Sequence, residues 1–414
     1  MTKIQLLPLL VYSIFGIIFS SRFIEVYFLP EHLKFWYLAS FIILLSFWVR
    51  LISGKYPKNL RLFYVFIAYI IVYFAIATLL DTQEQGLYIT RLILFVASLS
   101  TLPLLLTFPQ SSKNAEVLNK CFDRLLIITC AYAWYQFLGG LLGLPTGIEI
   151  FRGRNYGTFK QITSFFDEPA FFGQFLLATL YVNLCVKKER NLFLIILIIS
   201  TSLLTFSVFS ILSSLILSFL VFAQEVNFVQ STIRNFKIKK RLVALFILVF
   251  MLPISLNIIS QVYEINPLEI IYTRVEDELF NSVDELDISD NTSTISGSGQ
   301  VRIIGEINTA FLVLREKPLF GYGLNYSQSD IHRPLSLNVI TEILVRWGIV
   351  GLLLLVSFIF IEKNKYRSED WKIFVVFMML FCFGDGGIAK PIFWALLTII
   401  FFLERENSSS IEKS

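Results

Sequence analysis

Apolar residues in this chain are gathered into blocks of roughly fifteen to twenty residues, close to the length of about twenty that an α-helix needs to cross a bilayer. Hydrophobic side chains make up 56% of the chain and charged ones only 16%. A soluble fold uses narrower apolar stripes that alternate with polar residues, so blocks of this kind argue against one. We therefore expect an all-α, polytopic integral membrane protein with about twelve transmembrane helices.

The expected helices follow the apolar blocks, and the long block at 192–223 divides best into a hairpin that turns near Ser207. Serines in this hairpin are expected to pack helices together, because small residues let helices approach closely. The expected spans cover residues 6–20, 33–49, 60–80, 88–108, 122–142, 170–186, 192–206, 208–223, 242–259, 337–361, 371–383 and 391–403.

Lysine and arginine are concentrated in alternate loops, and such loops stay on the cytoplasmic side of a membrane. The pattern predicts that both chain termini are cytoplasmic and that two long loops face outward. The predicted parts are an N-terminal bundle of about nine spans at 1–259 that includes the outer loop 143–169, a large extracytoplasmic loop at 260–336, C-terminal membrane helices at 337–404 and a cytoplasmic tail at 405–414.

The two outward loops contain more arginine than the charge rule predicts. A guanidinium group binds phosphate oxygens bidentately and stays charged at any relevant pH, so a phosphate or diphosphate at the outer face would explain these residues. Ion pairs with nearby carboxylates, or contact with anionic lipid head groups, would explain them as well. The candidate anion-binding residues are Arg152, Arg154, Arg302 and Arg333.

The large outer loop contains an amphipathic helix at 299–316, because its apolar residues recur at helical spacing. Pro318 is expected to end this helix. The following segment, Lys-Pro-Leu-Phe-Gly-Tyr-Gly, is typical of a turn in which Gly321 and Gly323 allow tight backbone geometry and close approach of a ligand. Asn338 then enters a span that contains the sequence Gly-Ile-Val-Gly.

The order of an arginine, this helix, the glycine turn, an outer loop, an asparagine and the Gly-Ile-Val-Gly span resembles the O-antigen polymerase and O-antigen ligase superfamily of bacterial envelope glycosyltransferases. A second stretch, 152–169, is also similar to the family. Its ending, Ser-Phe-Phe-Asp-Glu-Pro, is closer to Wzy-type polymerases than to ligases. Ligases place a histidine directly before the asparagine of the late span, where this chain has Leu337.

The resemblance implies an O-antigen or polysaccharide polymerase of the bacterial inner (plasma) membrane, with a role in lipopolysaccharide biosynthesis. Such an enzyme transfers a growing undecaprenyl-diphosphate-linked glycan onto the next lipid-linked repeat unit at the outer face of that membrane. It needs no metal and no cofactor. The implied partners are the lipid-linked oligosaccharide, the lipid bilayer and a chain-length regulator protein, and no nucleic acid is expected.

The same resemblance suggests roles for individual residues. Arg154 and Arg302 would neutralise the diphosphate leaving group where charge develops in the transition state, with Arg152 in reserve for the first. Two residues compete for the role of catalytic base. They are His332, the histidine of the large outer loop, and Glu168, a carboxylate beside a proline at the mouth of a span, where partial desolvation would raise its pKa.

Two other functions remain open at this point. The first is an O-antigen ligase, which moves the finished glycan to the lipid A core and belongs to the same chemical class. The second is a transporter or flippase for lipid-linked oligosaccharides. A transporter should contain internal repeats and broken helices with charged residues near the middle of the membrane.

Overall fold

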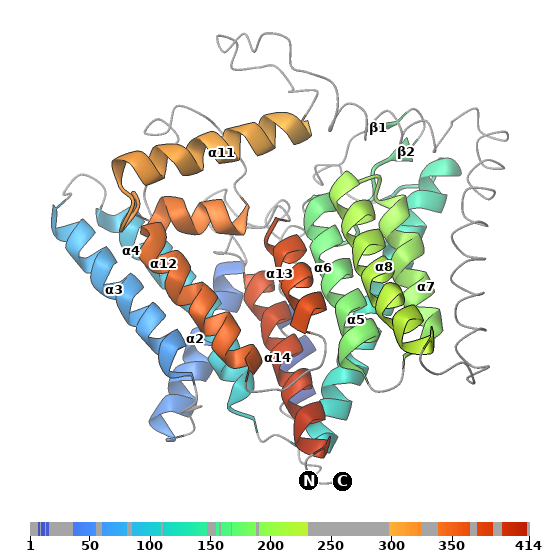
Figure 1. Cartoon of the computed structure of the whole chain (residues 1–414), viewed down its shortest axis with the longest axis horizontal. Coiled ribbons are helices and arrows are strands. Elements are labelled where there is room, and N and C mark those ends of the chain that lie inside the picture. The colour runs from blue at the N-terminus through green and yellow to red at the C-terminus, as the bar shows by residue number, and fades with distance from the viewer. Residues whose placement is uncertain are drawn as a thin grey trace.

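The computed structural model of the chain is a bundle of helices, with one helix, α11, lying across one end (Figure 1). The helical class predicted from the apolar blocks is therefore confirmed. The structure describes residues 36–54, 60–80, 85–108, 111–146, 155–156, 159–166, 168–187, 190–230, 298–323, 338–364, 371–383 and 391–411, with scattered positions between 7 and 15.

Apart from α11, the described helices overlap the predicted spans, but some are clearly longer: α5 begins ten residues before its predicted span, and α14 ends eight residues after its own. The predicted spans 6–20, apart from scattered positions, and 242–259 lie outside the described residues. The helices are α2 (Trp36–Ile52), α3 (Arg61–Leu80), α4 (Gln85–Leu106), α5 (Ser112–Leu141), α6 (Pro169–Tyr181), which continues into a π-helical turn (Val182–Val186), α7 (Leu192–Leu204), α8 (Val208–Gln230), α11 (Ser298–Glu316), α12 (Val339–Asn364), α13 (Trp371–Phe383) and α14 (Pro391–Ile411).

One small hairpin accompanies the helices in the described part of the chain. Strands β1 (Asn155–Tyr156) and β2 (Phe159–Lys160) pair antiparallel, with Asn155 opposite Lys160 and Tyr156 opposite Phe159. Figure 1 shows this hairpin at the same end of the bundle as α11, whereas the last turns of α14 lie at the opposite end. The final helix continues to Ile411, so residues predicted as a tail after 404 extend α14 instead.

Two of the described helices are long and apolar enough to cross a membrane, judged by length and composition. They are Pro169–Val186, most of which is buried inside the bundle, and Val339–Ile361. The other apolar helical segments of the described chain are shorter, at 10–17 residues: Ile42–Ile52, Arg61–Ile76, Phe95–Leu104, Leu192–Leu204, Val208–Gln224, Trp371–Phe383 and Phe393–Glu404.

Close helix packing holds the centre of the bundle together. At the crossing of α6 and α8, a Cβ atom on Gly173 would lie 2.8 Å from the Cβ of Ser210, so only glycine fits there without a shift. Gln174, the next residue, donates from Nε2 to the carbonyl of Phe381 in α13 at 3.0 Å. These contacts fix α6 between α8 and α13, which is how small residues and side-chain amides join helices in membranes.

The predicted hairpin near Ser207 is confirmed, with α7 ending at Leu204 and α8 beginning at Val208. Phe206 between them has φ 48°, a left-handed conformation that is uncommon for a non-glycine residue. Local hydroxyl groups complete the turn, since the Ser207 N–H donates to Thr205 Oγ1 at 3.2 Å. The serines expected to pack these helices are buried: Ser200, Ser202, Ser207, Ser210, Ser213 and Ser214.

Candidate functional site

The candidate site lies at the end of the bundle that carries α11, because the described residues of both family-like stretches gather there (Figure 1). Arg302 belongs to α11, Gly321 and Gly323 to the turn after it, and Asn338 to the start of α12. Glu168 begins α6. The side chain of Arg302 lies outside what the structure describes, as do the residues Arg152, Arg154, His332 and Arg333.

The span predicted at 337–361 is not one continuous helix. Gly348 has φ 62° and ψ −161°, which breaks α12 into a first half from Val339 to Trp347 and a second half from Ile349 to Asn364. Figure 1 shows the two halves meeting at a sharp angle. A helix break leaves carbonyl groups and N–H groups without partners within the helix, and in an apolar setting those groups need other partners.

The segment after α11 supplies those partners. Two carbonyl groups at the end of the first half accept hydrogen bonds from the turn. The N–H of Tyr322 donates to the carbonyl of Val345 at 2.6 Å, and the N–H of Gly323 donates to the carbonyl of Arg346 at 3.0 Å. The N–H groups that begin the second half donate back to it. Ile349 donates to the carbonyl of Pro318 at 2.8 Å, and Val350 to that of Leu319 at 3.2 Å. The turn at 318–323, called the insert below, therefore completes the broken helix.

Glycine is required on both sides of this contact. A Cβ on Gly321 would lie 2.5 Å from the Val345 carbonyl oxygen, and one on Gly348 would overlap the Leu319 carbonyl. Gly351 lies against the side chain of Trp347, and a Cβ added to Gly351 would overlap the Cβ of Trp347. The backbone of α12 thus approaches Gly321 closely. The predicted approach of a ligand at this turn stays a prediction.

Two tyrosines of α3 bond to the same region. Tyr69 donates its hydroxyl to the carbonyl of Trp347 at 3.0 Å, and Tyr73 donates to the carbonyl of Gly321 at 3.2 Å. The Tyr73 ring also lies nearly parallel to those of Tyr69 and Phe320, with centroids 6.1 and 6.3 Å away. The broken helix, the insert and α3 therefore form one connected unit.

Asn338 joins α11 to α12. Its side-chain oxygen accepts from the N–H of Thr341 at 2.8 Å, which caps the first half of α12. Its own N–H donates to Glu306 Oε1 of α11 at 2.9 Å, and its amide group donates to Glu306 Oε2. Asn338 was predicted to enter a span, and the structure adds that its bonds to Glu306 tie the start of α12 to α11.

A buried ion pair in the first half of α12 was missed by sequence reasoning. Arg346 Nη2 lies 2.8 Å from Glu342 Oε1, and the two side chains are only 17% and 7% exposed. The signal was present in the sequence, because the two residues stand four apart inside an apolar run, where ionisable residues are costly and mark functional sites by default.

Glu168 takes the N-cap position of α6, with φ −139° and ψ 151°, but its side chain does not bond to the helix N-terminus. In the segment before it, residues 161–166 are buried, apart from the half-buried Phe165. Gln136 of α5 accepts from the N–H of Ser164 at 2.8 Å, and Gln161 donates to the carbonyl of Thr205 at 2.8 Å. The half-buried Glu168 is therefore carried by backbone that is anchored on α5 and on the α7–α8 hairpin.

Among the described residues, no group of three or more His, Cys, Asp or Glu side chains is placed to hold a metal ion. None of the four cysteines, all of which lie in the described part of the chain, is in a disulfide. Comparisons of the chain with family models, with curated proteins and with solved structures found no match.

Proposed function

We propose that the chain is a polytopic inner-membrane glycosyltransferase of the O-antigen polymerase type. It would extend an undecaprenyl-diphosphate-linked glycan by transferring it to the next lipid-linked repeat unit outside the cytoplasm. The observation that carries the proposal is the convergence of the family-like motifs. The helix of Arg302, the glycine insert and Asn338 form one hydrogen-bonded unit, and that unit lies at the end of the bundle where α6 begins with Glu168.

Exposed apolar side chains support the membrane location. On α3, Val65, Val72 and Ile76 are more than half exposed at helical spacing, and comparable residues occur on α2, α5, α8 and α12. Monomeric soluble proteins rarely expose apolar surface on so many helices, whereas lipid covers it at no cost.

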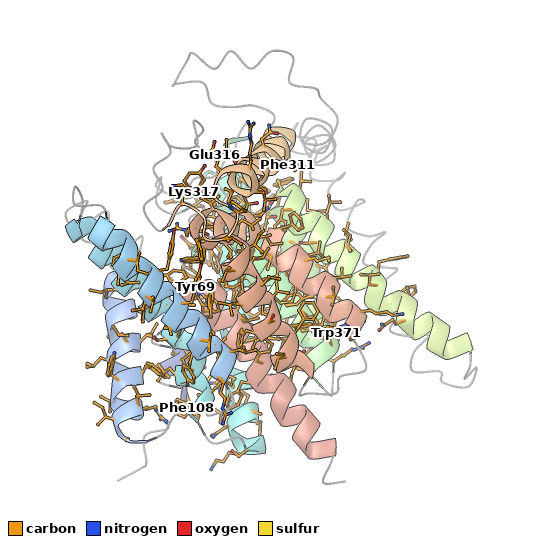
Figure 2. The ribbon with its side chains drawn as sticks, turned by 60° about the vertical axis from the view of Figure 1, so that its left-hand side comes forward. Tyr69, Phe108, Phe311, Glu316, Lys317 and Trp371 are labelled. Carbon is orange, nitrogen blue, oxygen red and sulfur yellow. The ribbon has the colours of Figure 1, made fainter. Side chains whose placement is uncertain are left out.

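The arrangement of charge supports the proposed orientation. The Arg50 guanidinium lies 3.9 Å from the centre of the Phe108 ring. Figure 2 shows Phe108 near the end of the molecule opposite Phe311, Glu316 and Lys317. Arg50 belongs to a predicted cytoplasmic loop, so α11 would lie on the outer side.

The chemistry follows from the proposed roles. An acceptor hydroxyl of the incoming repeat unit attacks the anomeric carbon of the growing glycan, and the bond from that carbon to the diphosphate oxygen breaks. The leaving diphosphate takes the electron pair and is neutralised by Arg154 and Arg302, with Arg152 two residues before Arg154 and Arg333 directly after His332. The proton of the acceptor passes to Glu168 or His332.

A second candidate, a transporter of lipid-linked oligosaccharide, gains support from one observation. The broken helix α12 carries the buried Glu342–Arg346 pair, and discontinuous helices with charged residues are typical of transport sites. In such sites the free helix ends bind the substrate. Here the insert bonds to the ends on both sides of the break, which favours the enzyme.

The glycan phenotype of a strain that lacks the gene separates these functions. The polymerase proposal predicts surface lipid A core that carries a single repeat unit. Long polymer left on the lipid carrier would indicate a ligase, and single repeat units trapped on the inner leaflet would indicate a flippase. Either of the last two outcomes overturns the proposal.

The role of the arginines is tested by returning variants to that strain. Arg302→Ala and Arg154→Ala should each abolish polymer formation while the protein stays in the membrane at normal amounts. Arg315→Ala is the matched control, because Arg315 is exposed near the end of the same helix, α11. Polymer formation by both Arg302→Ala and Arg154→Ala would remove the diphosphate role.

A further inference from the structure

The amphipathic helix α11 has its apolar face turned away from the protein. Val313 and Thr309 are buried, on the side that packs on α12. The opposite side carries Ile307, Phe311 and Leu314, which are 49%, 67% and 40% exposed. A surface helix of a soluble domain places its apolar stripe toward the core, so this inverted arrangement calls for an apolar partner outside the described part of the chain.

The exposed stripe continues into the insert and reaches the flank of the bundle. Leu319 and Phe320 are 56% and 49% exposed. The Phe320 ring stacks on Tyr73 of α3, whose neighbour Val72 belongs to the exposed apolar surface of that helix. The apolar surface of α11 is therefore continuous with the surface that we propose to face lipid.

The depth of this contact fits the boundary of a bilayer. Tyr73 precedes Leu80, the last residue of α3, by seven residues, which is about 10 Å along a helix. Phe320, which stacks on Tyr73, thus lies below the outer end of a helix that would cross the membrane. Interfacial helices bury their apolar faces about 5–10 Å into the boundary between head groups and acyl chains.

Charged residues lie where lipid head groups would meet the helix. Arg315 is exposed at the end of α11, and Lys317 follows it with its Nζ 4.6 Å from the centre of the Tyr322 ring. Figure 2 shows Lys317 and Glu316 together near Phe311. Glu316 accepts from the Tyr322 hydroxyl. The two cations outnumber this one carboxylate, so the end of the helix complements anionic lipid.

We infer that the face formed by Ile307, Phe311, Leu314, Leu319 and Phe320 docks α11 into the outer leaflet of the bilayer. The inference rests on the proposed membrane location. With α11 docked in this way, the bilayer forms one wall of the candidate site. Lipid holds one side of α11, while the Glu306–Asn338 bonds hold the other, so the helix that contains Arg302 is fixed between membrane and bundle.

Nitroxide accessibility on the full chain tests this surface. Phe311→Cys and Asn308→Cys, both at exposed positions of α11, are labelled and reconstituted into vesicles of phosphatidylethanolamine and phosphatidylglycerol. Oxygen concentrates in lipid and a nickel chelate stays in water, so their relative collision rates report the surroundings of each label. The unsubstituted chain, labelled in parallel, gives the background from its four free cysteines.

A further label, Val72→Cys, separates this inference from the membrane proposal, because Val72 is 57% exposed on α3. We expect the ratio of oxygen to nickel collisions at Phe311 to approach that at Val72 and to exceed that at Asn308 severalfold. A label at Phe311 that favours nickel while Val72 favours oxygen would overturn the docking alone. Protection of Phe311 from both reagents would overturn it too, by indicating a protein partner. Nickel access at Val72 would instead reject the membrane location.

Discussion

Two breaks interrupt apolar stretches of this chain, and they are completed in different ways. Between α7 and α8, the break at Thr205–Ser207 is completed mainly by nearby hydroxyl groups, and a non-glycine residue takes the positive φ. Within α12, the break at Gly348 is completed by backbone from residues 318–323, a segment well before it in the sequence. A break that is completed locally can be recognised in the sequence from its hydroxyl-bearing residues. A break that is completed by a distant segment can be recognised there only from its glycines.

The largest effect should come from Gly348→Ala. The new Cβ would overlap the Leu319 carbonyl and push the insert out of the break, so we expect a loss of at least about 4 kcal/mol in the free energy of unfolding. Gly143→Ala is the matched control, with φ +68° and nothing within 4 Å of the new Cβ. Left-handed strain alone should cost the control about 1–2 kcal/mol. Chemical unfolding of both purified proteins in detergent measures the difference, and equal losses would mean that the insert does not fill the break.

A smaller effect is expected for Asn338→Ala. This change removes the cap of α12 and the side-chain bond to Glu306, while the backbone N–H of residue 338 can still donate to Glu306. The loss of a cap and of one bond to a carboxylate should cost about 2–3 kcal/mol, against about 1 kcal/mol for an ordinary N-cap. Ser111→Ala in α5 is the comparison, because Ser111 caps its own helix through the N–H of Asn114. If both variants lose the same stability, the bond from the Asn338 side chain to Glu306 contributes nothing.

The local break depends on one bond from outside the hairpin. Gln161→Met keeps the length of the side chain but removes the bond to the carbonyl of Thr205, which should cost about 1–2 kcal/mol. The same unfolding experiment measures it. Gln161 is buried, so a loss as large as that of Gly348→Ala would show that this break, too, is held by a distant segment.

The smallest effect is expected for Ser207→Ala. Its hydroxyl oxygen accepts from the N–H of Ser210 at 3.5 Å, a long bond, so its loss should cost about 0.5 kcal/mol. Thr205→Val should cost more, because the Thr205 hydroxyl donates to Ser202 at 2.7 Å and also accepts from Ser207. The reverse order would mean that Ser207, not Thr205, closes the hairpin.

Part of the candidate site was predictable because its residues act through local backbone rules. The helix before Pro318, the turn at Gly321 and Gly323 and the entry at Asn338 all follow from spacing and from the backbone preferences of proline and glycine. The roles of these residues were less predictable. Gly321 approaches the backbone of α12, and Asn338 binds Glu306, a residue of α11. Neither partner is adjacent in sequence, so periodicity carries no information about it.

The sequence by itself determined where the helices lie, since a block of apolar residues must satisfy its backbone groups within a helix. It also determined the hairpin at Ser207 and the end of α11. Only the tertiary structure decided that α12 is broken at Gly348, that Glu342 and Arg346 pair in its first half, and that the apolar face of α11 points away from the bundle. Hydropathy reports how apolar a segment is. The break at Gly348 depends instead on hydrogen bonds to the backbone of a distant segment, residues 318–323.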